Sequence, residues 1–523
     1  MNKIFLLLET ISFLKLSQVY YRVYFLIKNK FFKKIKYDSN YKTIIDLKWE
    51  NNIYNSESYF GDKTFCFLNI KYSFSFKIKW NYSKIDKLWL YNLNYFDYLN
   101  QKDIDKKAGL YLIKDFIKSY NKIIDGKESY PTSVRIINWI KFVSKNKIND
   151  NLVFKTLYED SKRLFNNIEY HILGNHILEN GFALFFASNL FNDSSFLNIS
   201  KNILTKQLNE QILNDGAHFE LSPMYHNHIL YRILDCIALQ ESNNKLLNKR
   251  LLKFLKIKTA LMLSWVKNIT YSNGDYPLLN DSILMDYSLL DIINYADKFN
   301  ISIKNIKLSD SGYRKWILKN TEIIIDIGKI GPDYIPAHAH ADTFNFELNF
   351  NNKPVIVDPS ISTYHNLEVR NKERSTEYHN TILIDNKNSS QVWSKFRVGS
   401  RAKVYVLEDS ENIINVYHDG YRKIKCFHNR SFLKKNNVFQ VVDIINHETQ
   451  HLFESNLHFH PQCNPIMINN NQIKVNNIIF HLSGYICPKI KKYKFSMGFN
   501  KRVTAYKLNS IVGHKSSIKI ILN

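Results

Sequence analysis

The sequence predicts two folded parts, a helical first part followed by an antiparallel β-sandwich. From about residue 84 to residue 300, apolar residues recur at helical spacing, whereas after about residue 303 they form short β-type runs between polar turns. This texture changes only once. The chain has 523 residues, of which 45% are hydrophobic and 14% aromatic, which is enough for two sizeable cores and argues against disorder.

Residues 1–36 predict an amphipathic helical segment. Lys3 precedes an apolar run, but Glu9 interrupts this run and no small-residue cleavage site follows, so we do not expect a signal peptide. No stretch reaches about 18 uncharged apolar residues, so no spanning helix is predicted. The segment either packs on the body of the protein or lies on an anionic membrane surface. Its basic side chains are Lys28, Lys30, Lys33, Lys34 and Lys36.

Residues 37–303 predict the helical part. Ile229, Leu230, Ile233, Leu234 and Ile237 share one face of a helix that we expect over residues 226–239. A second helix is expected to open at residues 175 and 176. Turn signals, such as the NGD run at 273–275, separate such segments.

Residues 304–523 predict the sandwich, because short β-type runs follow one another with polar turns between them. The clearest runs lie at 322–327, 343–350, 354–357, 381–384, 438–445, 478–482 and 518–522.

The most informative polar residues lie between residues 336 and 401. His338, His340 and Asp342 alternate along a segment that we expect to be extended, so they point to the same side as the apolar residues that continue the alternation. His340, Asp358 and His379, from three adjacent strands, would form the nitrogen and oxygen ligand set that zinc favours. The residues alone leave hydrogen-bonded core histidines as the alternative.

Charge and cysteine content narrow the choice of partner. A formal net charge of +25 favours an acidic polymer, although the chain is rich in Lys, Asn and Ile throughout, which fits codon bias equally. No basic tract has the motif chemistry of nucleic-acid binding. The five cysteines include no CxxC pair, so we expect free thiols.

Nine ordered motifs resemble the heparinase II/III family of polysaccharide lyases. They are WLYNLNYFDYL (89–99), YPTSVRIINWI (130–140), GNHILENGFAL (174–184), DGAHFELSPMYH (215–226), NGDYPLLNDS (273–282), PAHAHADTFNFEL (336–348), VIVDPSISTY (355–364), RSTEYHNT (374–381) and WSKFRVGSR (393–401). The resemblance implies an incomplete (α/α) toroid of alginate-lyase-like type at 37–303, then a β-sandwich at 304–523. With this resemblance, we expect one structural zinc ion, held by His340, Asp358 and His379.

The resemblance further implies catalytic roles. Tyr225 would be the central proton-transfer residue, with His338 facing it from the sandwich, and Asn175 and His176 would contact the substrate carboxylate. From the residues themselves, Glu179 lies one helical turn from His176 and is expected to orient its imidazole. A helix start near Tyr225 is expected to lower its pKa.

Further residues are candidates for substrate binding. Arg370 and Arg374 either bind sulfate or carboxylate groups of the polymer or form ion pairs with Glu368 or Glu373. The residues of the first part that match groove positions in such toroids are Trp89, Tyr91, Asn92, Tyr95, Arg135 and Trp139.

The predicted function is β-elimination on a glycan that contains uronic acid. A C5-epimerase and a non-catalytic glycan-binding protein remain open, because the first needs the same proton abstraction and the second the same groove. The lack of a convincing export signal, together with the amphipathic N-terminal segment, resembles the family subset found beside bacterial surface-polysaccharide genes. Because the sequence has no clear signal peptide, we expect a cytoplasmic or peripheral inner-membrane location in a bacterium, with the periplasm or cell envelope as the alternative. The sequence does not predict an oligomeric state.

Overall fold

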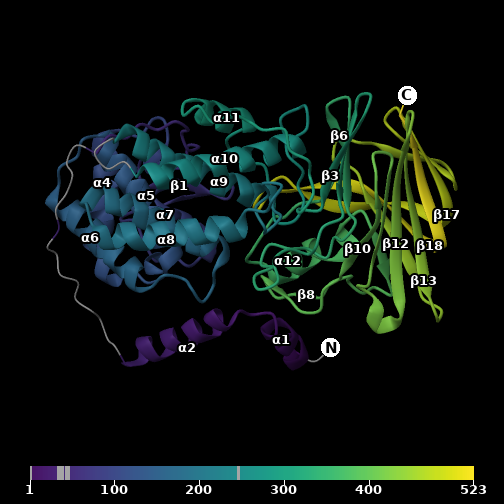
Figure 1. Ribbon diagram of the computed structural model, residues 1–523, viewed down its shortest axis with the longest axis horizontal. Helices are drawn as coiled ribbons and strands as arrows, with labels where there is room; N and C mark the ends of the chain where they lie inside the picture. The colour runs from purple at the N-terminus through teal and green to yellow at the C-terminus, as the bar shows by residue number, and fades with distance from the viewer. Residues whose placement is uncertain (1–2, 32–40, 42–46, 244–247, 523) are drawn as a thin grey trace.

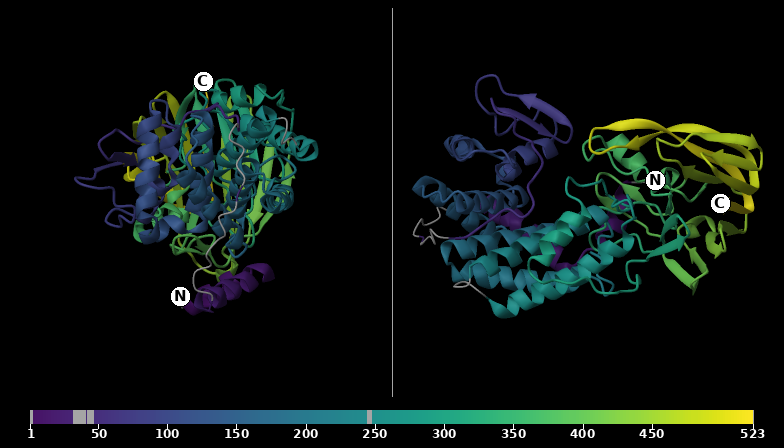
Figure 2. Two further views of the ribbon diagram at one scale, coloured as in Figure 1. Left: turned by 90° about the vertical axis from the view of Figure 1, so that its left-hand side faces the viewer. Right: turned by 90° about the horizontal axis from the view of Figure 1, so that it is seen from above.

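The computed structural model describes residues 3–31, 41, 47–243 and 248–522, and it has two parts side by side (Figure 1). The helical part and the sandwich follow one another along the longest axis, and the two helices at the start of the chain run beneath both. Figure 2 shows the same separation from above, with a small hairpin projecting from the helical part.

The helices of the first part pack around one continuous apolar core. Side chains cap their first turns: Asp86, Asp105, Asp150, Asp193 and Ser222 accept hydrogen bonds from backbone N–H groups. The helices are α3 (Lys87–Tyr95), α4 (Lys106–Ser119), α5 (Ser129–Lys145), α6 (Asn151–Asn166), α7 (Gly174–Phe191), α8 (Ser194–Gln211), α9 (Pro223–Ser242), α10 (Lys249–Ile269) and α11 (Leu289–Asp297).

The helical part also contains a small sheet that the sequence analysis missed. Strands β1 (Thr64–Phe67) and β2 (Ile70–Ser73) form an antiparallel hairpin. Phe65 packs on Tyr98 of the helical core, with ring centroids 5.3 Å apart. The prediction of a purely helical first part was therefore wrong at this hairpin. Each strand has only four residues, and an alternation this short is not recognisable in the sequence.

The second part is an antiparallel sandwich of two main sheets, as predicted. One has the order β3-β4-β5-β6 and the other β10-β11-β12-β13-β18-β17-β16-β15, with β14 and β7 attached. Phe346 of the first sheet meets Phe432 and Phe439 of the second, with ring centroids 5.9 and 5.7 Å apart. The strands are β3 (Tyr313–Leu318), β4 (Thr321–Asp326), β5 (Phe346–Phe350), β6 (Lys353–Ile356), β7 (Ile382–Ile384), β8 (Val392–Trp393), β9 (Arg397–Val398), β10 (Val404–Asp409), β11 (Ile413–His418), β12 (Cys426–Lys435), β13 (Val438–His447), β14 (Phe453–His458), β15 (Pro465–Asn469), β16 (Gln472–Val475), β17 (Ile478–Ser496) and β18 (Arg502–Ile521). The short helix α12 (Leu367–Glu373) lies between β6 and β7.

The segment around His338 and His340 is not the strand that its alternation suggested. Residues 336–345 form turns, and β5 begins only at Phe346. Phe344 has a φ of 68°, a left-handed conformation that interrupts extended backbone. The loop is held instead by hydrogen bonds from His340 N to Asn280 Oδ1 (3.1 Å) and from Ala341 N to the Arg374 carbonyl (2.9 Å).

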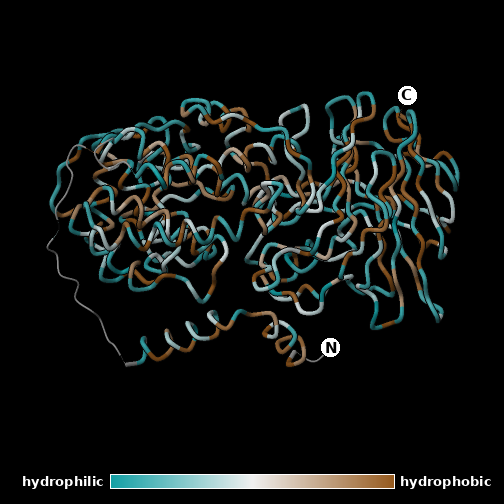
Figure 3. The backbone as a smooth tube through the Cα atoms, viewed as in Figure 1, coloured by the Kyte–Doolittle hydropathy of each residue, from teal (hydrophilic) through white to brown (hydrophobic). Residues whose placement is uncertain are grey.

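The first helices differ from the single amphipathic segment that was predicted. They are α1 (Lys3–Ile11) and α2 (Leu16–Phe31), bent by 113° relative to each other. Among the described residues, no single helix is long and apolar enough to cross a membrane, although this bent pair passes on length and composition. Lys33, Lys34 and Lys36 lie outside the described residues. In Figure 3, α1 consists mostly of hydrophobic residues, whereas hydrophobic and hydrophilic residues alternate along α2.

The cysteines are free, as expected. Cys236, Cys426 and Cys463 are buried, Cys66 is half-buried and Cys487 is exposed.

Candidate active site

A cleft of about 1280 Å³ lies where the two parts and the first helices meet. The helical part contributes Asn175, His176 and Tyr225, and the loop before β5 contributes His338. Helices α1 and α2 and the turn between them form a third wall through Leu7, Thr10, Ile11, Leu14, Gln18 and Arg22.

Tyr225 and His338 face each other in this cleft. Their ring centroids are 3.8 Å apart with an interplanar angle of 27°, so the phenol and the imidazole stack. Tyr225 lies in the first turn of α9, which begins at Pro223 with Ser222 as its cap. The Tyr225 hydroxyl lies 3.2 Å from the Tyr364 hydroxyl. The structure thus brings together the two residues that the resemblance selected from different parts of the chain.

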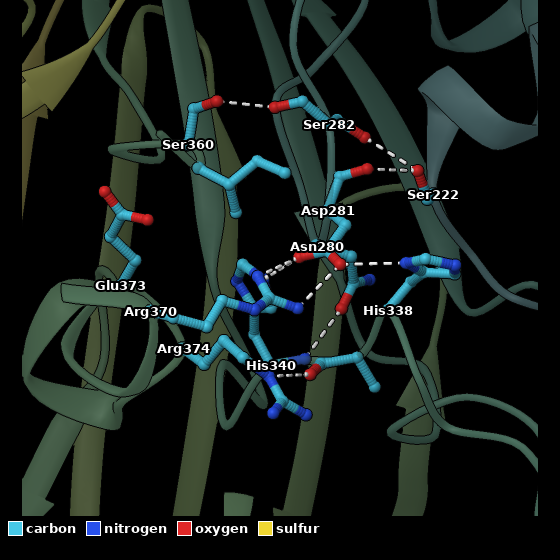
Figure 4. Close-up of polar contacts among 12 residues, drawn as sticks. Ser222, Asn280, Asp281, Ser282, His338, His340, Ser360, Arg370, Glu373 and Arg374 are labelled. Atoms are coloured by element: carbon cyan, nitrogen blue, oxygen red, sulfur yellow. Dashed lines mark hydrogen bonds and ion pairs between the residues drawn. The ribbon is translucent and has the colours of Figure 1, made fainter. Parts of the chain in front are cut away.

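Asp281 holds the loop that carries His338 (Figure 4). Its Oδ2 is 2.8 Å from His338 Nδ1, its Oδ1 is 2.8 Å from His340 Nε2, and Arg370 donates to both oxygens. Asp281 is fully buried. Burial alone would raise its pKa, but Arg370 and the two histidines outweigh burial and hold the pKa of this carboxyl well below its usual range. An ionised carboxylate of the helical part therefore positions two histidines of the sandwich.

The hydrogen bond to Asp281 also defines the tautomer of His338. An ionised carboxylate only accepts, so Nδ1 is the donor, and in the neutral imidazole the lone pair is on Nε2. Nε2 lies 3.4 Å from Glu220 Oε2. Burial raises the pKa of Glu220.

Asn175 and His176 open α7 beside this pair. His176 Nδ1 lies 3.0 Å from Glu169 Oε1. Burial lowers the pKa of His176, but Glu169 outweighs burial and the net shift is upward. The prediction that Glu179 orients this imidazole is wrong. Glu179 instead pairs with Arg232 at 2.8 Å, because its side chain points into the helical core.

The expected lowering of the Tyr225 pKa is also wrong. Burial raises the pKa of Tyr225 well above its ordinary value, and Tyr364 and Asp281 add to this shift. The helix start does not compensate for the loss of solvent around the phenol, which therefore stays protonated at neutral pH.

Most of the predicted substrate-binding residues lie in the core. Arg370 is committed to Asp281 rather than to either predicted glutamate, and Arg374 donates to carbonyl oxygens, including that of Ala339 at 3.0 Å. Arg135 pairs with Asp160 at 2.7 Å. Both Trp89 and Trp139, like these three arginines, are fully buried and do not line the cleft. The predicted residues that do line it are Tyr91, Asn92 and Tyr95.

The predicted metal ligands lie next to this network. One ligand atom each of Asp342, Asp358 and His379 lies within 4.8 Å of the others. His340 stands beside them, with its ring centroid 5.3 Å from that of His379. Among these four residues, three buried atoms have no hydrogen-bond partner: His340 Nδ1, Asp342 Oδ2 and His379 Nε2. These nitrogen and oxygen atoms are suitable ligands for a metal ion. Asp342 thereby joins the three ligands that the sequence analysis predicted.

Three functional candidates escaped the sequence reasoning, namely Asp281, Glu220 and Tyr364. Each lies inside a motif that carries the resemblance, and Asp281 directly precedes the serine that ends NGDYPLLNDS. The motif was a usable signal, but the partners of these residues come from distant parts of the chain.

The fold and this cleft define a class of proteins that join a helical toroid to an antiparallel sandwich. The structure is similar to the crystal structure of heparinase III, with a TM-score of 0.69 and 18% identity over 92% of this chain and 83% of that one. It is also similar to chondroitin AC lyase of Streptomyces coelicolor, with a TM-score of 0.50 and 6% identity over 83% and 74% of the two chains.

The family follows from sequence models. The heparinase II/III N-terminus model matches residues 129–306 and the heparinase II/III-like C-terminal model matches residues 304–515, so the chain belongs to the heparinase II/III family. A heparin-sulfate lyase of Bacteroides stercoris is 26% identical over 309 residues, and one of Bacteroides thetaiotaomicron is 24% identical over 318 residues. Each match covers 52% of this chain and only 44% of the relative.

Proposed function

We propose that this protein is a polysaccharide lyase that cleaves a uronic-acid-containing glycan by β-elimination. The observation that carries the proposal is the stacked pair of Tyr225 and His338 in the cleft, with His338 held by Asp281. The names of the relatives, which are heparin-sulfate lyases, support the same class of reaction. A net charge of +25 would attract an acidic polymer.

His338 is the proposed base. Its Nδ1 donates to Asp281, so Nε2 is the atom that would take the proton from C5 of the uronate. The electron pair of the C5–H bond forms the C4–C5 double bond, and the C4–O bond breaks. Tyr225 is the proposed acid, because burial keeps its phenol protonated until it donates to the departing C4 oxygen.

Asn175 and His176 are proposed to stabilise the uronate carboxylate. Both line the cleft in the first turn of α7, where the helix dipole favours an anion. Glu169 favours the protonated form of His176, which supplies a donor to the negative charge that develops next to C5.

We also propose one structural zinc ion held by His379 with Asp358, Asp342 and His340 as the candidate partners. His340 Nε2 is bound to Asp281, an arrangement common for metal-bound histidines, whose second nitrogen donates to a carboxylate. His379 Nδ1 is bound to Asp358 Oδ2 (2.7 Å), which leaves Nε2 of His379 for the ion. When bound, the ion would crosslink the loop before β5 and would not activate water. His338 would then keep its position through both Asp281 and this loop.

The test is incubation with a panel of acidic glycans, including bacterial surface polysaccharides, followed by the ultraviolet absorbance of unsaturated uronates. We expect new absorbance with at least one glycan. Tyr225→Phe should lower the rate by about 10²- to 10⁴-fold. The matched control Tyr111→Phe, at an exposed position on α4, should keep the wild-type rate.

The products separate the alternatives. A C5-epimerase would exchange the C5 proton with heavy water and leave the chain length unchanged. A glycan-binding protein would retain the polymer without exchange or cleavage. Either result would contradict the lyase proposal.

A further inference from the structure

The outward surface of α1 and α2 is apolar. We call six of its residues the outer stripe: Leu8, Leu16, Tyr20, Val23, Leu26 and Ile27. Leu16 is 88% exposed and Leu26 is 73% exposed. Within α2, residues 16, 20, 23 and 27 follow the i, i+4, i+7, i+11 spacing of one helical face. A continuous apolar face of this length on a soluble surface marks an interaction site.

The opposite face of the pair is fixed to the protein. On the sandwich side, Trp393 Nε1 donates to Thr10 Oγ1 (3.1 Å) and Lys423 pairs with Glu9 (2.8 Å). On the helical side, the buried Gln18 donates to the Ile172 carbonyl (3.0 Å), and Tyr21 stacks on Tyr170 at 4.7 Å. The helices are therefore docked through polar and aromatic contacts, and the outer stripe is the side that the protein itself leaves exposed.

We propose that the outer stripe docks this protein on an anionic membrane surface. The apolar side chains are followed in sequence by KNKFFKKIK at 28–36, which has five lysines and no acidic residue. An apolar helical face that is followed in the sequence by a basic run matches a bilayer interface, where acyl chains lie next to anionic headgroups.

Geometry favours a helix pair lying on the bilayer over one that spans it. The 16 residues of α2 measure about 24 Å, less than the hydrocarbon thickness of about 30 Å. The bend of 113° prevents α1 from extending α2, and spanning would also break the contacts of Thr10 and Gln18. The stripe therefore inserts only to the depth of its side chains.

Docking in this way would place the cleft at the membrane surface, because Leu7, Thr10, Ile11, Gln18 and Arg22 of the same helices line it. This consequence rests on the proposed function and favours a glycan that is carried at a membrane. The docking itself does not depend on catalysis.

The experiment is co-sedimentation of the full chain with vesicles of phosphatidylcholine alone or mixed with phosphatidylglycerol. We expect binding to the mixed vesicles that weakens with salt. The double variant Leu16→Glu/Leu26→Glu should bind at least about tenfold more weakly, because two apolar side chains are replaced by charges of the same sign as the lipid. Neither residue lines the cleft, so its rate on a soluble glycan should stay at the wild-type level.

The control is Phe76→Glu/Ile317→Glu, which changes two exposed apolar residues outside the helix pair and should bind vesicles like the wild type. The proposal would be overturned if the wild-type protein bound neither kind of vesicle. A wild-type dimer, measured by light scattering, that dissociates in the Leu16→Glu/Leu26→Glu variant would also overturn it, since a second copy would then cover the stripe. Vesicle binding without glycan cleavage would contradict only the proposed function.

Discussion

Replacing Asp281 with asparagine should separate its two effects, on stability and on catalysis. The change keeps the shape of the side chain and removes its charge, which leaves the guanidinium of Arg370 buried without a counter-ion. Breaking a buried pair in this way costs about 3–5 kcal/mol. For a part of about 200 residues, this corresponds to a drop in melting temperature of roughly 6–20 °C.

The catalytic effect of the same change follows from the His338 tautomer. An asparagine amide that turns its N–H₂ group toward His338 forces the proton onto Nε2, the atom that must accept the C5 proton. We expect kcat to fall by about 10³- to 10⁴-fold at a temperature where the variant is folded. Asp103→Asn, at an exposed carboxylate, is the control.

A second variant tests the physical reason. Asp281→Asn/Arg370→Met removes both charges, so it should recover part of the lost melting temperature without recovering activity. The reasoning is refuted if Asp281→Asn alone melts within about 1 °C of the wild type and turns over at more than half its rate.

Three further outcomes are expected. His176→Gln should lower kcat/KM by about 10²- to 10³-fold, measured on the glycan that the panel selects, because the neutral amide lacks the positive charge that stabilises the carboxylate; an unchanged value would remove His176 from the site. His379→Ala should reduce bound zinc, measured by elemental analysis, and lower the melting temperature, whereas the exposed His514→Ala should change neither; a fully loaded His379→Ala protein would contradict the ligand assignment. Burial would raise the pKa of Asp443, but Arg430 outweighs burial and brings this pKa to about 2. Asp443 therefore contributes about 2 kcal/mol to the free energy of unfolding above pH 4. This contribution is lost as the pH falls from 4 to 2. Urea unfolding across this range should show that loss in the wild type, and an equally steep loss in Asp443→Asn would contradict it.

The sequence predicted the regular elements better than the contacts between them. The helix that contains Ile229 and the strands of the sandwich follow from local spacing, which survives folding wherever one face is buried. The alternation of His338 and His340 imitated a strand, but turns and hydrogen bonds from Asn280 shape that loop. Local spacing carries no information about such partners.

The candidate active site was likewise predictable only in part. Tyr225 and His338 were found through motifs, whereas Asp281 is an ordinary loop aspartate until folding brings it next to residues 57, 59 and 89 positions later. Trp139 shows the converse error, because a motif position expected in the groove is fully buried in the core. Burial and pairing of this kind are set by tertiary packing.

The attachment of α1 and α2 to both halves limits how the molecule can flex. Glu9 is tied to the sandwich through Lys423, and Gln18 is tied to the helical part through the Ile172 carbonyl. A hinge motion that separates the helical part from the sandwich has to strain or break the contacts of α1 and α2 with one of these parts. The width of the cleft entrance therefore depends on how α1 and α2 are docked. A long polymer chain has to enter through an opening of limited width.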